Sequence, residues 1–371
     1  MLKKMIIKNF KCFKNETVFD FRKTNYRLLE KNTYEKTVKG ALFVGENASG
    51  KTTAIQPVKL LLDLLLADRD ISLNLYQCFF SDNKITELKY EFLIGGHEIN
   101  YGFSFSGNRF LTEQLEVDHD EIIDRIGTNA MLNLEKEDSF YDIDDSLLFL
   151  KRVYFNTKFS GHRVLLEWFD YLKKSVYIDS LRRRIATYNG ESLTYRNYLK
   201  KYGTDKLNRF LEMNHFRYSV QYDHEKFDEE GREVSFVHED IGISIPMFME
   251  SAGNQAFINI LPAILTTVER GGMLIIDEFS SGLHNKLEEL LVSYIMQYSD
   301  ALQLFFVSHS TNLLSNSLLR PDQIYAVELT DTDGSKLLRF SEEQPRAAQN
   351  LEKMYLSGVF GGIPEYGIDK K

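Results

Sequence analysis

The pattern of hydrophobic and polar positions divides the chain into segments of different character. Apolar and polar residues alternate over 85–117, as in antiparallel strands, and short apolar runs near the start predict further strands. A mostly polar pattern with helical spacing runs from about residue 120 to 215, and strand-like segments return over 216–248. A helix over about 254–270 then opens an alternation of strands and helices that continues to about residue 340.

This order predicts an α/β protein in which one unit, with a mixed sheet and an antiparallel N-terminal lobe, is interrupted by an inserted, mainly helical arm. We place the first part of the unit at residues 1–111, the arm at 112–240 and the second part of the unit at 241–371. The 129 residues of the arm explain why the chain is longer than one such unit requires.

Composition places the chain among soluble globular proteins. Its 371 residues are 43% hydrophobic and 27% charged, which excludes disorder as the main state. Two cysteines, Cys12 and Cys78, are too few for a disulfide framework or a structural zinc site, so we expect a cytoplasmic protein. The longest apolar stretch, 58–67, contains Lys59 and Asp63 and is far shorter than the about 20 residues of a membrane span, so we expect no membrane association.

The net charge of -9 is unevenly distributed. Residues 111–150 hold 2 Lys/Arg against 12 Asp/Glu, whereas residues 151–220 hold 15 Lys/Arg against 6 Asp/Glu. The basic segment 151–220 contains an arginine run at 182–184 and interleaved tyrosines, which are Tyr188, Tyr195, Tyr198 and Tyr202. Cations contact phosphates and aromatic rings stack on bases, so a DNA or RNA interface is one hypothesis. A solvated helical face over an aromatic core, and docking onto the acidic segment, are the other two.

The sequence GENASGKT at residues 45–52 fits the phosphate-binding pattern GxxxxGK[ST]. It follows the apolar run 41–44 and precedes a helical pattern, which is the context that the motif requires. Its glycines let backbone N–H groups converge on phosphate oxygens, Lys51 would reach the β- and γ-phosphates, and the Thr52 hydroxyl would coordinate Mg²⁺. We therefore expect ATP and Mg²⁺ as cofactors. The nucleotide-binding residues expected in this segment are Asn47, Ala48, Ser49, Gly50, Lys51, Thr52 and Thr53.

Two apolar runs nearer the C-terminus end in candidate catalytic residues. The run 273–276 ends in Asp277 and Glu278, where carboxylates are costly to bury unless a cation is present. Asp277 fits a Mg²⁺ ligand, and Glu278 fits a group that polarises the attacking water. His309 follows the run 304–307 and comes 31 residues after Glu278, which leaves room for one helix and one strand. At the end of a neighbouring parallel strand, His309 could reach the γ-phosphate.

A fourth element, the segment 250–255, precedes a predicted helix and offers serine and glycine groups that can donate to an anion. In the order phosphate loop, serine segment, acidic strand and histidine, the four elements resemble the ABC-type ATPases of the SMC/RecF/OLD class. The resemblance implies that Ser251, Gly253 and Gln255 contact the γ-phosphate of another chain, so that two chains sandwich two ATP molecules. The Mg²⁺ ligands that it implies are Thr52, Gln77 and Asp277.

Residues 277–284, 320–325 and 355–364 are similar to the bacterial AbiLi/RloA ATPases, which are abortive-infection proteins commonly encoded beside a smaller TOPRIM-like effector. This resemblance implies an ATP-hydrolysing subunit of an antiphage system. Its homodimer, or a larger homo-oligomer, would then control an effector protein from a neighbouring gene. A DNA-repair or DNA-end-binding ATPase of the RecF/SMC type is the alternative, with nucleic acid bound by the basic segment 151–220.

Overall fold

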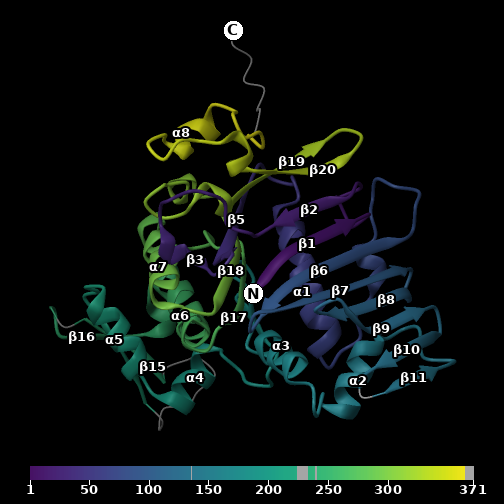
Figure 1. Ribbon diagram of the computed structural model, residues 1–371. Coiled ribbons are helices and arrows are strands. Elements are labelled where there is room, and N and C mark those ends of the chain that lie inside the picture. Colours follow the sequence, from purple (N-terminus) through teal and green to yellow (C-terminus); the bar gives the residue numbers. More distant parts are fainter. Residues whose placement is uncertain (135, 224–232, 239, 364–371) are drawn as a thin grey trace.

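Two large β-sheets form the body of the protein (Figure 1). The computed structural model describes residues 1–134, 136–223, 233–238 and 240–363. The first sheet has eight strands, all paired antiparallel, in the order β11-β10-β9-β8-β7-β6-β1-β2. Its strands are β1 Leu2–Lys8, β2 Thr17–Asp20, β6 Thr86–Ile94, β7 His97–Ser106, β8 Arg109–Val117, β9 Asp120–Ile126, β10 Asn129–Asn133 and β11 Glu137–Phe140.

The second sheet has seven strands in the order β13-β12-β17-β18-β5-β19-β20. These are β5 Gly40–Val44, β12 Val176–Asp179, β13 Arg184–Thr187, β17 Gly272–Asp277, β18 Leu302–Val307, β19 Ile324–Thr330 and β20 Gly334–Arg339. The five inner strands are parallel, and the edge strands β13 and β20 are antiparallel to their neighbours. Every residue of β5, β17 and β18 is buried, as expected for parallel strands that are covered on both faces.

Helices cover both faces of the second sheet. The α-helices of the described residues are α1 Lys51–Leu66, α2 Phe149–Thr157, α3 Arg163–Lys173, α4 Tyr195–Tyr202, α5 Asp205–Met213, α6 Ala252–Arg270, α7 Asn285–Tyr298 and α8 Leu351–Leu356. Successive strand residues point to opposite faces. Phe43 and Ile275 share a core with the first sheet, α1 and α3, whereas Leu42 and Ile276 share a core with α6 and α7. The second sheet therefore separates two hydrophobic cores.

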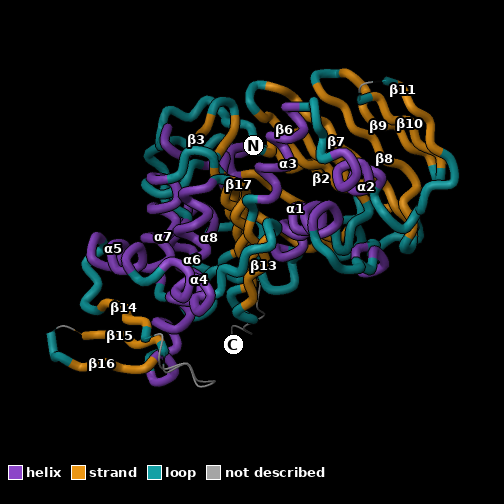
Figure 2. The backbone as a smooth tube through the Cα atoms, turned by 90° about the horizontal axis from the view of Figure 1, so that it is seen from below, coloured by secondary structure: helices purple, strands orange, loops and turns teal. Residues whose placement is uncertain are grey.

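A third sheet, called the small sheet below, lies at the opposite end of the molecule from β9, β10 and β11 (Figure 2). It consists of the antiparallel strands β14 Ser219–Tyr222, β15 Val234–His238 and β16 Ile243–Pro246. Phe236 of the small sheet and Phe257 of α6 belong to one hydrophobic core, so the small sheet packs on the helical side of the second sheet. A further pair of short strands, β3 Thr33–Tyr34 and β4 Thr37–Val38, is antiparallel.

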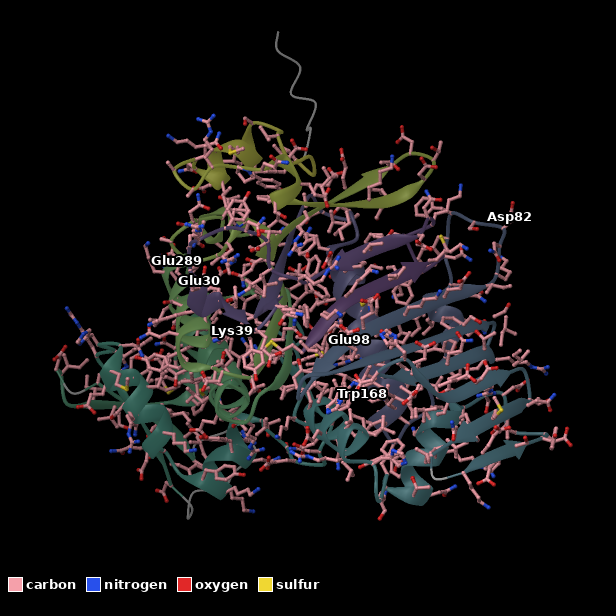
Figure 3. All side chains as sticks on the ribbon, viewed as in Figure 1. Glu30, Lys39, Asp82, Glu98, Trp168 and Glu289 are labelled. Carbon is pink, nitrogen blue, oxygen red and sulfur yellow. The ribbon has the colours of Figure 1, made fainter. Side chains whose placement is uncertain are left out.

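A buried carboxylate attaches the start of α2 to the first sheet. Glu113 of β8 accepts hydrogen bonds from the Phe149 N–H at 2.6 Å and from the Tyr101 hydroxyl at 2.9 Å. Its partner Arg125 lies 3.4 Å away, and both charged side chains are fully buried. Trp168 of α3, labelled in Figure 3, packs on the Tyr101 ring and is also fully buried. Paired charges and aromatic contacts thus join α2, α3 and the first sheet.

The α/β fold with an antiparallel N-terminal lobe is confirmed, as are the strands expected over 85–117 and the helix expected over 254–270. The helical pattern expected for most of residues 120–215 is wrong for two stretches. Residues 120–140 contain β9, β10 and β11 of the first sheet, and residues 176–187 contain β12 and β13 of the second. The sequence of β9, DEIIDRI, is mostly charged because one face of an antiparallel sheet can be solvated, and this concealed the strand.

The expected arm at 112–240 is therefore divided among three sheets. Within it, α4, α5, β14 and β15 lie outside the two large sheets, and we propose a narrower insertion that runs from α4 to β16. The turn expected within the strands of 216–248, at residues 229–231, lies outside the described residues. Among the helices described, none combines the length and the apolar character needed to cross a membrane.

Candidate nucleotide-binding site

The segment Gly45–Gly50 forms a loop that leads from β5 into α1. Gly45 and Gly50 have φ values of 152° and 107°, and a Cβ at Gly45 would lie 2.2 Å from the carbonyl oxygen of Val327. Ala48 adopts the left-handed conformation as well, with a φ of 64°. Glycine is therefore required where the loop passes close to β19. A loop of this shape at the N-terminus of a helix favours a bound anion.

The first residue of α1, Lys51, brings a positive charge to this loop. Its ammonium donates to the carbonyl oxygen of Glu46 at 2.6 Å. Burial lowers the pKa of Lys51, whereas the nearby carboxylates of Glu278, Glu46 and Asp277 act to raise it. Among the described residues, the buried hydroxyl of Ser49 has no hydrogen-bond partner. The ammonium and the unpartnered hydroxyl are donors that fit phosphate oxygens.

Thr52 joins the loop to the acidic end of β17. Its hydroxyl donates to Asp277 Oδ1 at 2.9 Å, although the two residues are 225 positions apart. Burial raises the pKa of Asp277, and the negative charges of Glu278 and Asp179 act in the same direction, whereas the hydrogen bond from Thr52 opposes the rise. The carboxylates therefore repel one another unless a cation lies between them. A hydroxyl and a carboxylate in contact are oxygen ligands of the kind that Mg²⁺ prefers.

Glu278 and His309 follow neighbouring parallel strands, and their side chains meet. His309 Nε2 lies 3.3 Å from Glu278 Oε2, and the two side chains are 41% and 29% exposed, so a substrate can reach them. The His309 N–H donates to the Ser280 hydroxyl at 3.3 Å. A cavity of about 200 Å³ beside them is bordered by residues 44–47 of the phosphate loop, His309 and Tyr355 of α8. The structure thus brings both predicted catalytic residues to the phosphate loop.

A buried carboxylate that the sequence analysis missed supports the His309 segment. Glu288 of α7 is fully buried and accepts hydrogen bonds from the hydroxyls of Ser308 at 2.9 Å and Ser310 at 2.7 Å. Burial raises the pKa of Glu288, and the two hydroxyl donors oppose the rise. Because these serines flank His309, Glu288 fixes the backbone that carries it. The Ser-His-Ser sequence was a visible sign, but its partner lies on another element.

The segment Ser251–Gln255, called the signature segment below, caps and begins α6. The Gln255 side-chain amide donates to the carbonyl oxygen of Glu250 at 2.8 Å. A Cβ at Gly253 would lie 3.2 Å from the carbonyl oxygen of Gly282, in the loop that follows Glu278. The signature segment is thus held at the start of α6, on an element separate from the phosphate loop of its own chain.

The strand beside β17 ends in a carboxylate, and Gln77 lies elsewhere. Asp179 is paired with Asp277 in the parallel register of β12 and β17, and Asp179 is 6% exposed. It accepts hydrogen bonds from the Arg182 backbone at 2.9 Å and from the Arg182 guanidinium at 3.0 Å. The Gln77 amide instead donates to the carbonyl oxygen of Lys84 at 3.4 Å. Asp179 therefore stands beside the candidate Mg²⁺ ligands, and the apolar run 176–178 before it was the overlooked sign.

The tyrosines of the basic segment 151–220 serve largely as internal contacts. Tyr188 and Tyr198 are 7% and 3% exposed, and the Tyr188 hydroxyl donates to Asp63 of α1 at 3.0 Å. The Tyr202 hydroxyl and the Lys201 ammonium both contact Glu191. Buried rings do not stack on bases, so these contacts favour a solvated face over an aromatic core.

Solved structures share this architecture. The SMC head domain from Thermotoga maritima is 13% identical over 91% of this chain and 98% of that chain, with a TM-score of 0.52. The Smc head domain bound to the C-terminal domain of ScpA, derived from Pyrococcus furiosus, is 13% identical over 91% and 95%, with a TM-score of 0.47. The recombination mediator protein RecF is 14% identical over 91% and 98%, with a TM-score of 0.41. No curated protein matches the chain.

The family described as "AAA domain, putative AbiEii toxin, Type IV TA system" matches residues 41–315. The matched range is most of the chain, and it contains the phosphate loop, the signature segment, Asp277, Glu278 and His309. The likeness to the Thermotoga maritima head shows that the fold around these residues is that of an SMC head. The chain therefore belongs to this AAA-domain family and is an ATPase of the SMC/RecF type.

Proposed function

We propose that the protein binds ATP together with Mg²⁺ and hydrolyses it to ADP and phosphate. The observation that carries this proposal is the hydrogen bond between Thr52 and Asp277, which joins the phosphate loop to the acidic strand end. Mg²⁺, when bound, would neutralise charge on the β- and γ-phosphates, with Thr52 and Asp277 as its ligands from the chain. Lys51 would exchange its bond to the Glu46 carbonyl for bonds to phosphate oxygens, which are stronger because both partners are charged.

Glu278 would orient the attacking water by accepting a hydrogen bond from it, and His309 would hold the γ-phosphate from the neighbouring strand. The water oxygen forms a bond to the γ-phosphorus while the bond to the ADP oxygen breaks, and the water releases a proton. The Glu278→Gln variant keeps the shape of the side chain but loses its charge. We expect retained ATP binding and a loss of turnover of about 100-fold or more. Hydrolysis at the parental rate would remove Glu278 from this role.

We propose further that two chains pair around two nucleotides, with Ser251, Gly253 and Gln255 of one chain contacting the γ-phosphate held by the other. The position of the signature segment at a helix N-terminus supports this role, because such an end favours an anion. In the Glu278→Gln background, sizing with and without ATP should show an ATP-dependent dimer. Ser251→Arg adds bulk and charge at the contact, so it should abolish the dimer while ATP binding by the single chain persists.

This pairing would control an effector protein, such as a TOPRIM-like nuclease, in an antiphage system. The family description supports the proposal, since it refers to a toxin of a toxin–antitoxin system. The direct test is phage protection in cells that express the chain with its neighbouring gene. Lys51→Ala should abolish protection if ATP drives the response, whereas protection by this variant at the parental level would separate the ATPase from defence.

A DNA-repair or DNA-end-binding ATPase is the second candidate, favoured by the exposed arginine run at 182–184. Binding of fluorescent duplex and single-stranded DNA over a salt series distinguishes the two functions. Phosphate contacts would make the affinity fall steeply as salt rises. A lack of salt-dependent binding would reject this candidate.

A further inference from the structure

The side chain of Glu250 lies against the N-terminus of α6, where the signature segment begins. Its Oε2 accepts hydrogen bonds from the Ser251 N–H at 2.6 Å and from the Asn254 side-chain amide at 2.9 Å. Its Oε1 lies 3.0 Å from His238 Nε2. The Glu250 side chain is only 7% exposed, so these donors surround it from three positions. The donors lower the pKa of Glu250, although burial acts to raise it. Glu250 is therefore an anion in place.

An anion in this position has a direct consequence for nucleotide contact. The N–H groups at a helix N-terminus and the partial positive charge of the helix stabilise a nearby negative charge. Glu250 already uses the Ser251 N–H and the Asn254 amide for this purpose. A γ-phosphate that approaches the same helix end is a second anion, and the two repel at short range. The phosphate and the Glu250 carboxylate therefore compete for the same donors.

The small sheet holds Glu250 in this position. His238 belongs to β15, and the Tyr218 ring lies 5.7 Å from the His238 ring. The Tyr218 hydroxyl donates to the side-chain oxygen of Asn254 at 3.4 Å. On the other side, the Arg183 guanidinium donates to Gln255 Oε1 at 3.4 Å. The polar groups of the signature segment are thus occupied by groups of their own chain.

We propose that Glu250 is a positioning residue that occupies the signature segment of the single chain as an internal substitute for phosphate. It must move aside before the nucleotide of a second chain can bind there. This inference rests on the proposed pairing of two chains through Ser251. It assigns Glu250 a restraining role in pairing, with the small sheet as the element that sets the strength of the restraint through His238.

The test compares ATP-dependent dimerisation of variants in the Glu278→Gln background. Glu250→Gln keeps the size of the side chain and removes its charge, so the ATP concentration for half-maximal dimer should fall about tenfold, equivalent to about 1.4 kcal/mol. His238→Ala releases one contact of Glu250 and should lower this concentration by a smaller factor. Glu269→Gln is the matched control, since Glu269 lies at the far end of α6, exposed and paired with Lys206, and it should change nothing.

ATP affinity of the single chain, measured by titration under conditions that prevent pairing, should be the same in all these variants. A half-maximal ATP concentration for Glu250→Gln equal to or above that of the parent overturns the proposal, provided that Ser251→Arg still abolishes the dimer. If Ser251→Arg forms the dimer normally, the pairing through Ser251 fails and the role of Glu250 falls with it. Lower thermal stability of Glu250→Gln combined with easier dimerisation supports the proposal, because a purely structural role would weaken both.

Discussion

Asp277 is placed where its charge benefits catalysis and costs stability, so Asp277→Asn should stabilise the nucleotide-free protein while abolishing its ATPase activity. Asn keeps the oxygen that accepts from Thr52, so the change removes mainly charge. Neighbouring strands lie about 4.8 Å apart, and at an effective dielectric constant of about 20 two carboxylates about 5 Å apart repel by about 3 kcal/mol. Arg182 offsets much of the repulsion by binding Asp179, and we expect a net gain of about 1 kcal/mol.

The gain should depend on pH with a definite sign. The folded-state pKa of Asp277 is raised, so the parent is not penalised at low pH, where this carboxyl is protonated in both folded and unfolded states. As pH rises through the raised pKa, the parent loses stability relative to Asp277→Asn. Urea unfolding of the nucleotide-free protein from mildly acidic to neutral pH should therefore show a difference that grows with pH. A less stable variant at neutral pH, or a pH-independent difference, would refute this reasoning.

Asp322 provides the matched control with the opposite sign. It is fully buried and accepts hydrogen bonds from the Arg320 guanidinium at 2.9 and 3.0 Å and from the Thr24 N–H at 2.7 Å. Burial alone would raise its pKa, but these donors lower it overall. Asp322→Asn leaves the buried guanidinium of Arg320 without its counter-charge and should destabilise the protein by about 3 kcal/mol or more at neutral pH. Equal effects of the two Asp→Asn changes would contradict the electrostatic assignment of both.

Three further predictions follow from individual contacts. Lys51→Ala should weaken ATP binding at least about tenfold in a calorimetric titration, because the phosphates lose a charged donor; unchanged affinity would contradict the site. Gln77→Ala should leave ATP turnover near the parental rate, whereas Asp179→Asn should lower it roughly tenfold, since it releases Arg182 beside Asp277; the reverse order would restore Gln77 as the metal ligand. Arg125→Met should destabilise the first sheet by about 3–5 kcal/mol in urea unfolding, because a buried carboxylate loses its counter-charge, and no loss would show that this carboxyl is folded in its neutral form.

The central strands and the phosphate loop could be predicted because their signals are local. A parallel strand that is buried on both faces reads as a continuous apolar run, and Met273–Ile276 and Leu304–Val307 are such runs. The conformation of the phosphate loop depends on glycine at Gly45 and Gly50, which is visible in eight residues of sequence. The order of these segments predicted that Asp277, Glu278 and His309 lie close to the loop, and the structure brings them there.

Other parts of the site depend on pairing between distant segments, which a sequence pattern does not contain. β12 follows two helices and a long polar stretch, and its four residues become informative only when they pair with β17. Gln77 was chosen as a metal ligand by its distance along the chain from the phosphate loop, whereas the position beside Asp277 is decided by strand order. Glu288 likewise acquires its role only when α7 packs beside Ser308 and Ser310.

The arginine run shows how strand order changes the meaning of a charge pattern. In sequence, residues 182–184 belong to a basic segment and suggest phosphate contacts along a nucleic acid. In the structure, Arg182 compensates Asp179 beside Asp277, and Arg183 donates to Gln255 of the signature segment. A single turn between β12 and β13 thus contacts the acidic end of the site of its own chain and the segment proposed to serve the site of the other chain. Positive charge at this turn is needed by both contacts whether or not nucleic acid binds, so the charge alone does not favour a nucleic-acid partner.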